Sequence, residues 1–234
     1  MPSNSDRKTQ HASLRLKIRP RVLTEDQKAI RVNISQELLD RVSVDENFLK
    51  TIVTGDETWV YGYNVETKAQ SSQWVGQESP RPKKAQMIRS NMKVMMAIFF
   101  NWQGVIHYEF VPRGQTVNKA FYLAVLKRLR EAERRKRPQL WTNQSWVLHH
   151  EHAPAHSSFL VRNFLAKNET TVVPQPSYSP DLALADFFLF PTLKSTLKGL
   201  RFDTFDKIQK NLTKDLFAIP KEAFQKAFQS WQKR

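Results

Sequence analysis

Three acidic residues, Asp56, Glu151 and Asp186, each stand at or just beyond the end of a strand-like apolar run. The segments that contain them are FLKTIVTGDETW, QSWVLHHEHAPAH and TTVVPQPSYSPDLALADFFLF. Strand ends are where a sheet presents side chains to a ligand at its rim. Carboxylates that converge there can hold two divalent ions, which together activate a phosphodiester for cleavage. The three acids are therefore candidate catalytic residues and candidate metal ligands for chemistry on DNA.

The ligand types favour Mg²⁺ (or Mn²⁺), because hard dications bind oxygen and leave coordination positions for phosphate and water. In this interpretation Asp56 lies on a central strand, Glu151 follows the neighbouring strand, and Asp186 comes from a helix across the sheet. Metal-activated water would cleave the first strand, and a DNA 3′-hydroxyl would join strands. Two of the acids also have a structural interpretation, Asp56 as a turn aspartate and Asp186 as an early-helix aspartate. Spacing alone does not identify a nuclease.

The composition favours a polyanionic partner. The 234-residue chain carries 37 Lys and Arg against 22 Asp and Glu, a formal charge of +15. Nucleic acid is the first candidate, and a merely basic surface is the alternative. Cysteine is absent, which excludes disulfides and Cys-based zinc sites. The first twenty residues lack a secretory h-region and no apolar run would span a bilayer, so we expect an intracellular protein without a membrane partner or a small organic cofactor.

Periodicity predicts an α/β fold, a mixed sheet flanked by helices. The expected helices span 24–42, 118–137, 154–167, a segment through Asp186, 204–217 and 220–232. The expected strands are 48–53 and 58–63 as a hairpin around Gly55, 93–100 and 105–110 as a second hairpin, then 145–149 and 170–173. A long polar loop, 64–91, separates the two hairpins, and loops of that length are usually functional or mobile. Residues 1–22 form a basic arm that we expect to be poorly ordered.

Two basic segments are candidate DNA-binding surfaces. The helix 118–137 contributes Lys127, Arg128, Arg134 and Arg135, and the long loop contributes Arg81, Lys83 and Lys84. Such side chains would bind the phosphate backbone without reading sequence, although a solvated helix face is the alternative. The stretch ERRKRP at 133–138 is also typical of a nuclear localisation signal.

Four histidines crowd around Glu151. Of these, His152 and His156 are four residues apart and could share a helical face with Glu151 as a zinc site. Pro154 lies between them, so we favour histidines with structural roles over a native zinc site. The segment does not match the H-E-x-x-H pattern of metalloproteases.

Three ordered motifs of the chain resemble the signature blocks of mariner-family transposases, in the Tc1/mariner superfamily. They are TGDETWVYGY, HHEHAPAH and YSPDLALADFFLF, and 34 residues separate Glu151 from Asp186, as between the second and third catalytic aspartates of that family. The resemblance runs from about Leu23 to the C-terminus. A SET–mariner fusion protein contains the same family domain. It implies a ribonuclease-H-like catalytic domain over 23–234, with a long loop inserted after the first hairpin. It further implies dependence on Mg²⁺ or Mn²⁺, cut-and-paste DNA transfer and a homodimer. With the basic stretch at 133–138, we expect a nuclear location.

The chain also departs from the family pattern. The usual H-D-N-A-P-x-H motif is His150-Glu151-His152-Ala153-Pro154-Ala155-His156 here, so glutamate replaces the second aspartate. The longer side chain displaces the carboxylate, and catalytic ligands tolerate only about 0.5 Å of misplacement. Leu184 stands where the family has proline, and the linker preceding Leu23 is degraded. The family's helix-turn-helix modules are missing before residue 23, so we expect an impaired, truncated transposase, with a catalytically dead DNA-binding or dimerisation remnant as the alternative. No SET-like segment is present, so we expect no methyltransferase activity.

Overall fold

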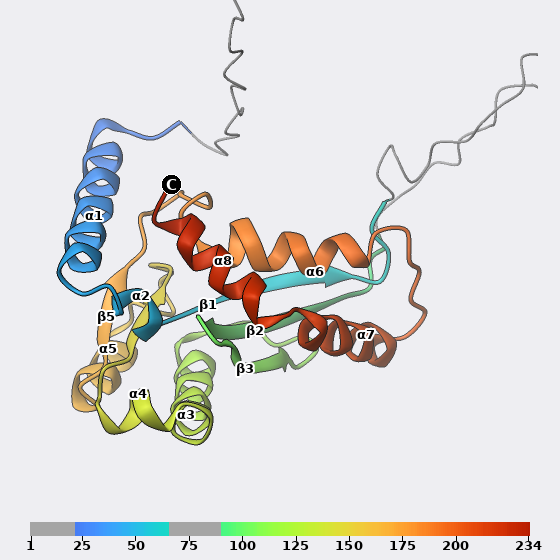
Figure 1. The fold of residues 1–234 in the computed structure, drawn as a ribbon. Coiled ribbons are helices and arrows are strands. Elements are labelled where there is room, and N and C mark those ends of the chain that lie inside the picture. The colour runs from blue at the N-terminus through green and yellow to red at the C-terminus, as the bar shows by residue number, and fades with distance from the viewer. Residues whose placement is uncertain (1–21, 66–89) are drawn as a thin grey trace, which may run out of the picture.

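The computed structural model describes residues 22–65 and 90–234. In chain order the helices and strands are α1 (Glu25–Val44), α2 (Phe48–Thr51), β1 (Ile52–Tyr61), β2 (Lys93–Asn101), β3 (Gly104–Val111), α3 (Lys119–Lys136), α4 (Pro138–Thr142), β4 (Val147–His150), α5 (Phe159–Lys167), β5 (Thr171–Pro174), the π-helical turn η1 (Ala185–Leu189), α6 (Phe190–Thr196), α7 (Phe205–Ala218) and α8 (Lys221–Trp231). The five strands form one mixed sheet with helices on both faces, as predicted (Figure 1).

The strand order is β3-β2-β1-β4-β5, so the long strand β1 is central. It runs antiparallel to β2 along most of its length but parallel to β4 only from Ile52 to Thr54. Because β4 is short, the second half of β1 has no strand neighbour on that side. Thr54 is opposite His149, and continuing this register brings Asp56 level with Glu151. The fold therefore opens a gap in the sheet beside Asp56.

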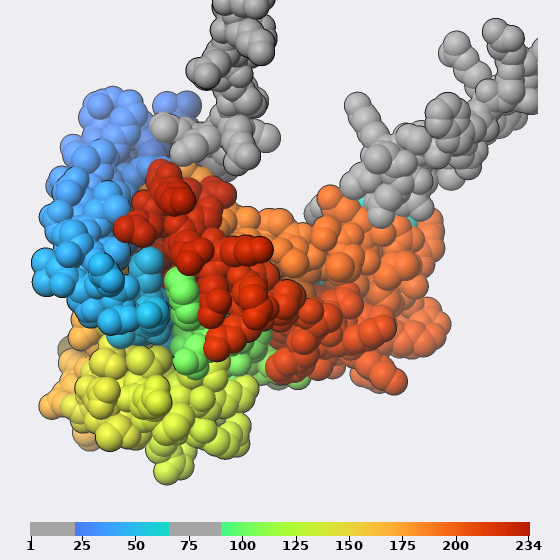
Figure 2. Space-filling view, viewed as in Figure 1, coloured from blue at the N-terminus to red at the C-terminus, as the bar shows by residue number. Residues whose placement is uncertain are grey.

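Alternation along β1 gives each face of the sheet its own core. Ile52 packs with Ile98, Phe100 and the helices η1, α6 and α8, whereas Val53 packs with Phe99 and the helices α3 and α5. In the space-filling view the C-terminal helices α7 and α8 lie across the front of the molecule and hide most of the strands (Figure 2). Residues at even positions of β1 thus face the C-terminal helices, and residues at odd positions face α3 and α5.

The predicted hairpin 48–53/58–63 is wrong. Residues Phe48–Thr51 form the short helix α2, and Ile52–Tyr61 is one continuous strand through Gly55. Gly55 makes no turn and pairs with Phe99 of β2, whose ring occupies the space where a side chain at position 55 would be. An added Cβ would lie 2.2 Å from that ring. The glycine permits close packing of β1 against β2, and Asp56 therefore lies within a strand.

Most other predicted elements are confirmed. Thr24 and Gln27 form the predicted capping box of α1, and the second hairpin turns at Gly104, whose φ is +116°. The side chain of Asn118 caps α3 by accepting hydrogen bonds from the backbone amides of Ala120 and Phe121. The helix expected from Pro154 begins later, at Phe159, after a turn. The basic arm and nearly all of the long loop lie outside the described residues.

The helix α1 is attached to the body by a few specific contacts. Arg31 donates two hydrogen bonds to the Asp181 carboxylate, at 2.8 and 2.7 Å. Val42 is buried in the same core as Trp231 of α8. Among the helices within residues 22–65 and 90–234, none is long and apolar enough to cross a membrane.

We expect Gly55→Ala to destabilise the fold. The new methyl would collide with Phe99, which is 1% exposed and cannot move without displacing its own core. Overpacking of this kind costs roughly 1–3 kcal/mol. Urea denaturation would measure the loss, and Gly55→Ala/Phe99→Leu should recover part of it. A Gly55→Ala protein as stable as the parent would show that the sheet does not depend on this contact.

A second stability prediction concerns Glu133 on α3, which is fully buried and has no hydrogen-bond partner for either carboxylate oxygen. Burial raises its pKa to about 7, partly opposed by the charge of Arg137. The folded state therefore holds a proton that the unfolded chain releases above pH 4.5, and stability falls as pH rises towards 7. Glu133→Gln removes this cost.

The difference in unfolding free energy between Glu133→Gln and the parent should grow from pH 4.5 to 7 by roughly 1–3 kcal/mol and then level off. Titrations common to both proteins cancel in this difference. Glu222→Gln, which removes one exposed carboxylate on α8, is the matched control for the loss of charge. A flat difference for Glu133→Gln would contradict the buried, proton-binding carboxyl group.

Candidate active site

The structure places the three predicted acids in one electrostatic cluster at the gap beside β1. Asp56 lies on β1 two residues beyond the last pairing with β4, and Glu151 immediately follows β4. Asp186 lies on η1, which contacts β1. The predicted elements, a central strand, the end of its neighbour and a helix across the sheet, are those observed. The roles of the three acids as catalytic residues and metal ligands stay predictions.

The cluster has an excess of negative charge. Burial and the nearby carboxylates of Glu57, Glu151 and Asp186 together raise the pKa of Asp56 to about 8, partly opposed by the hydrogen bond from the Glu57 backbone amide. Burial also raises the pKa of Glu151 and Asp186, where His156 and Lys194 respectively oppose the shift. Acids this close become fully ionised together only if a cation compensates them. A carboxylate donor set of this kind fits a hard dication such as Mg²⁺ or Mn²⁺.

Asp186 is held by an irregular helix. The segment Ala185–Leu189 is a π-helical turn, a feature that often occurs at functional sites. On either side of Asp186, Leu184, Ala185 and Leu189 are buried in the core that η1 shares with α6 and α8. The apolar neighbours anchor the turn, so that the half-buried acid is directed towards the sheet.

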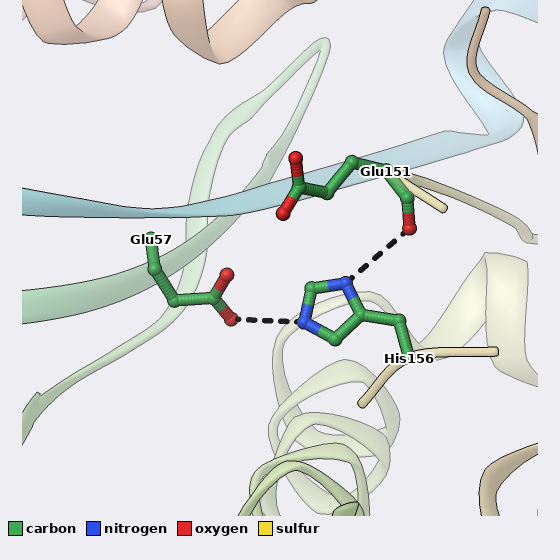
Figure 3. A group of neighbouring side chains, drawn as sticks. All are labelled: Glu57, Glu151 and His156. Atoms are coloured by element: carbon green, nitrogen blue, oxygen red, sulfur yellow. Dashed lines mark hydrogen bonds and ion pairs between the residues drawn. The ribbon is translucent and has the colours of Figure 1, made fainter. Parts of the chain in front are cut away.

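A second group, which the sequence prediction missed, lies next to the three acids. Ligand atoms of Glu57, Glu151 and His156 all lie within 4.8 Å of one another. The carboxylate of Glu57 points towards the imidazole ring, and the side chain of Glu151 extends over β1 (Figure 3). Glu57 was overlooked because a hairpin turn was expected at this point. The signal was its position beside Asp56 in a strand, which puts it on the opposite face.

Tyr122 supports the histidines of this group. Its hydroxyl is hydrogen-bonded to Nδ1 of His150 at 2.6 Å, and its ring stacks on that of His156 with 3.7 Å between centroids. Tyr122 is almost fully buried. Burial lowers the pKa of His150 to about 3, so this imidazole is neutral at physiological pH. His152, the other candidate zinc ligand, is exposed and is not part of the group.

The basic residues of α3 are not among the charges that shift the pKa values of the three acids. Lys127, Arg128, Arg134 and Arg135 are all exposed, and a rise of about 1.5 Å per residue puts Arg135 about 20 Å along the helix from Tyr122. Arg128 donates two hydrogen bonds to Glu109, and Arg134 is paired with Glu131. Among the described residues, Lys127 and Arg135 form no ion pair. Arg81, Lys83 and Lys84 lie outside the described residues.

Comparison with known proteins agrees with the motifs. Residues 64–143 match the family model described as transposase (partial DDE domain). The chain is 35% identical over 206 residues to the Mariner Mos1 transposase of Drosophila mauritiana, across 88% of this chain and 58% of that protein. It is 29% identical over 221 residues to the human histone-lysine N-methyltransferase SETMAR, across 92% of this chain and 31% of that protein. The chain thus spans well under two thirds of either relative.

The crystal structure of the catalytic domain of Mos1 superposes with a TM-score of 0.75 at 30% identity, and each chain covers 92% of the other. The five-stranded mixed sheet flanked by helices is thus a ribonuclease-H-like catalytic fold. The chain belongs to the mariner family of transposases and corresponds to their catalytic domain. Mos1 paired-end complexes have been solved with Mn, at a TM-score of 0.84, and with Mg, at 0.83.

Proposed function

We propose that this chain cleaves and joins DNA strands in a reaction that depends on Mg²⁺ or Mn²⁺, with Asp56, Glu151 and Asp186 as the catalytic carboxylates. The observation that supports this most directly is their convergence at the gap beside β1, where burial and mutual repulsion raise the pKa of Asp56 to about 8. Full ionisation of these acids would require cations, which is the condition that divalent ions meet. The Mos1 complexes with Mn and with Mg support the same choice of metals.

When bound, the divalent ions would supply Lewis-acid stabilisation of the phosphodiester and of the attacking oxygen. Asp56, on the rigid central strand, would fix the position of the site. Asp186 would hold the opposite side from η1, and Glu151 would close the gap from the end of β4. The surrounding apolar cores exclude water from the back of the site, which strengthens the electrostatic interactions inside it.

The glutamate at position 151 is expected to slow the reaction. Its carboxylate lies one methylene further from the backbone than that of an aspartate, and its ligand atoms approach Glu57 and His156. A misplacement of about 1 Å in a catalytic group can cost about a hundredfold in rate. We therefore propose an impaired enzyme, for which a catalytically dead DNA-binding or dimerisation remnant is the alternative outcome.

The partner is DNA, and we propose that the exposed basic residues of α3 contact its backbone. His107, Lys127, Arg128, Glu131, Ala132 and Arg135 line a shallow hollow at this surface. Lys127 and Arg135 are the better candidates, because Arg128 and Arg134 have counter-charges within the chain. Work on DNA implies a nuclear location, and the family resemblance implies a homodimer on paired transposon ends.

A plasmid-nicking assay with Mg²⁺ and with Mn²⁺ tests the catalytic proposal. We expect slow, metal-dependent nicking by the parent, loss of nicking in Asp56→Ala, and at least tenfold faster nicking in Glu151→Asp. Circular dichroism would confirm that each variant is folded. Asp26→Ala, at an exposed acid on α1, is the matched control and should nick like the parent.

Each other outcome has a definite meaning. Nicking that persists in Asp56→Ala would reject the proposed centre. Nicking by Glu151→Asp alone would identify the natural chain as a disabled nuclease, and no nicking by any folded variant would leave only the DNA-binding remnant. A parent as fast as Glu151→Asp would show that the site accepts glutamate.

The proposed DNA surface predicts the salt dependence of binding. In Lys127→Ala/Arg135→Ala, affinity for duplex DNA should fall, and the slope of log affinity against log salt should decrease by nearly two, since each lost phosphate contact removes about 0.9. Fluorescence anisotropy at several salt concentrations would measure both. The control Lys210→Ala/Lys214→Ala removes the same charge from exposed positions on α7. Equal effects of the two pairs would indicate a general charge effect instead of a surface on α3.

A further inference from the structure

Glu57 and Asp56 are adjacent acids on one strand, and they face opposite sides of the sheet. Asp56 lies on the face of Ile52, towards η1, and Glu57 lies on the face of Val53, towards α3 and α5. A single metal ion therefore cannot be coordinated equally well by the carboxylates of Asp56 and Glu57. Glu151 stands where β4 has ended, so it can approach either face. Its ligand atoms lie within 4.8 Å of those of Glu57 and His156.

The hydrogen bonding of His156 leaves one ring nitrogen available. Its Nδ1 lies 3.3 Å from the backbone carbonyl oxygen of Glu151, and a carbonyl only accepts, so Nδ1 carries a proton. Histidines that bind metals through Nε2 usually have this arrangement, in which the other ring N–H donates to a carbonyl or carboxylate. The stacked ring of Tyr122 holds the imidazole in place.

The remaining nitrogen faces a carboxylate oxygen that accepts no hydrogen bond. Nε2 of His156 lies 3.5 Å from Oε1 of Glu57, which is longer than a normal hydrogen bond. That oxygen is buried and has no hydrogen-bond partner. The side chains are 3% and 12% exposed, so water does not compensate them freely. A cation between a lone pair on Nε2 and the carboxylate would satisfy both groups.

We propose that Glu57, Glu151 and His156 form a second metal subsite that binds a first-row transition dication, such as Mn²⁺ or Zn²⁺, in preference to Mg²⁺. An imidazole nitrogen favours transition metals, whereas Mg²⁺ prefers oxygen ligands alone. Metal–ligand bonds of about 2.1 Å place the ligand atoms of one ion about 3–3.5 Å apart. Small side-chain movements would therefore contract the observed group around an ion.

This subsite differs from the zinc site that the sequence brought into consideration. The zinc site considered from the sequence used His152 as its second histidine, and His152 is exposed and outside the group. In the proposed subsite Glu57, on β1, is the third ligand instead. The inference deepens the proposed function and rests on it only through Glu151, which the two sites share. It implies that the longer side chain at position 151 directs its carboxylate towards the histidine-bearing face.

Pulsed electron paramagnetic resonance of the Mn²⁺-loaded full chain tests the assignment without any measurement of activity. The parent should show ¹⁴N modulation from a bound imidazole that persists in excess Mg²⁺. His156→Gln should lose it, and the matched control His152→Gln should retain it. Glu57→Gln, which leaves the imidazole in place, should weaken Mn²⁺ and Zn²⁺ binding at least tenfold by calorimetry.

An absent ¹⁴N signal in the parent, its persistence in His156→Gln, or unchanged affinity in Glu57→Gln would overturn the proposal. Circular dichroism of the variants ensures that a lost signal does not reflect unfolding, and Glu57→Gln provides a second measurement if His156→Gln fails to fold. Metal-dependent nicking without nitrogen coordination would reject this subsite alone. Nitrogen coordination without nicking would support the subsite and reject the proposed catalysis.

Discussion

The arrangement of the site depends on one constraint, the length mismatch between β1 and β4. The strand β1 is ten residues long, but β4 pairs with only three of them. Beyond Thr54 the central strand therefore has a strand neighbour on one side only, and its side chains can be approached from the gap. Asp56 and Glu57 lie in that part of the strand, and Glu151 lies where β4 stops. Since the gap is part of the sheet topology, the acids are positioned by the most rigid part of the fold.

The charges at this gap oppose folding in the absence of cations. Burial raises the pKa of Asp56, Glu151 and Asp186, and the ammonium group of Lys194 compensates only part of the charge. A folded protein tolerates this energetic cost only where the surrounding packing fixes the positions of the acidic side chains. The two cores on either side of the sheet and the packing of Phe99 against Gly55 provide that surrounding structure. Binding energy from cations would then act on a site already in place, which is the usual condition for electrostatic catalysis.

The sequence predicted the sheet, its two layers of helices and the elements that contain the three acids, because those segments have clear periodicity and caps. It failed at Gly55. Glycine followed by aspartate is typical of a turn, but here a ring from the neighbouring strand occupies the space of the missing side chain. That contact is tertiary, and nothing local to TGDE encodes it. The same error hid Glu57, since the face of a strand residue can be assigned only once the strand is known to be continuous.

The substitution at position 151 has more than one consequence once both faces of β1 are considered. If only Asp56 and Asp186 are considered, the extra methylene of Glu151 does no more than displace its carboxylate. In the folded site, however, the neighbours of Glu151 include Glu57 and a histidine whose Nδ1 lies close to the glutamate's own carbonyl. The backbone carbonyl of Glu151 orients the imidazole of His156, and the side chain of Glu151 approaches the same imidazole. If both proposals hold, a single change of side-chain length would alter the metal preference of the site as well as its rate, because position 151 lies between two sets of possible donors on opposite faces of one strand.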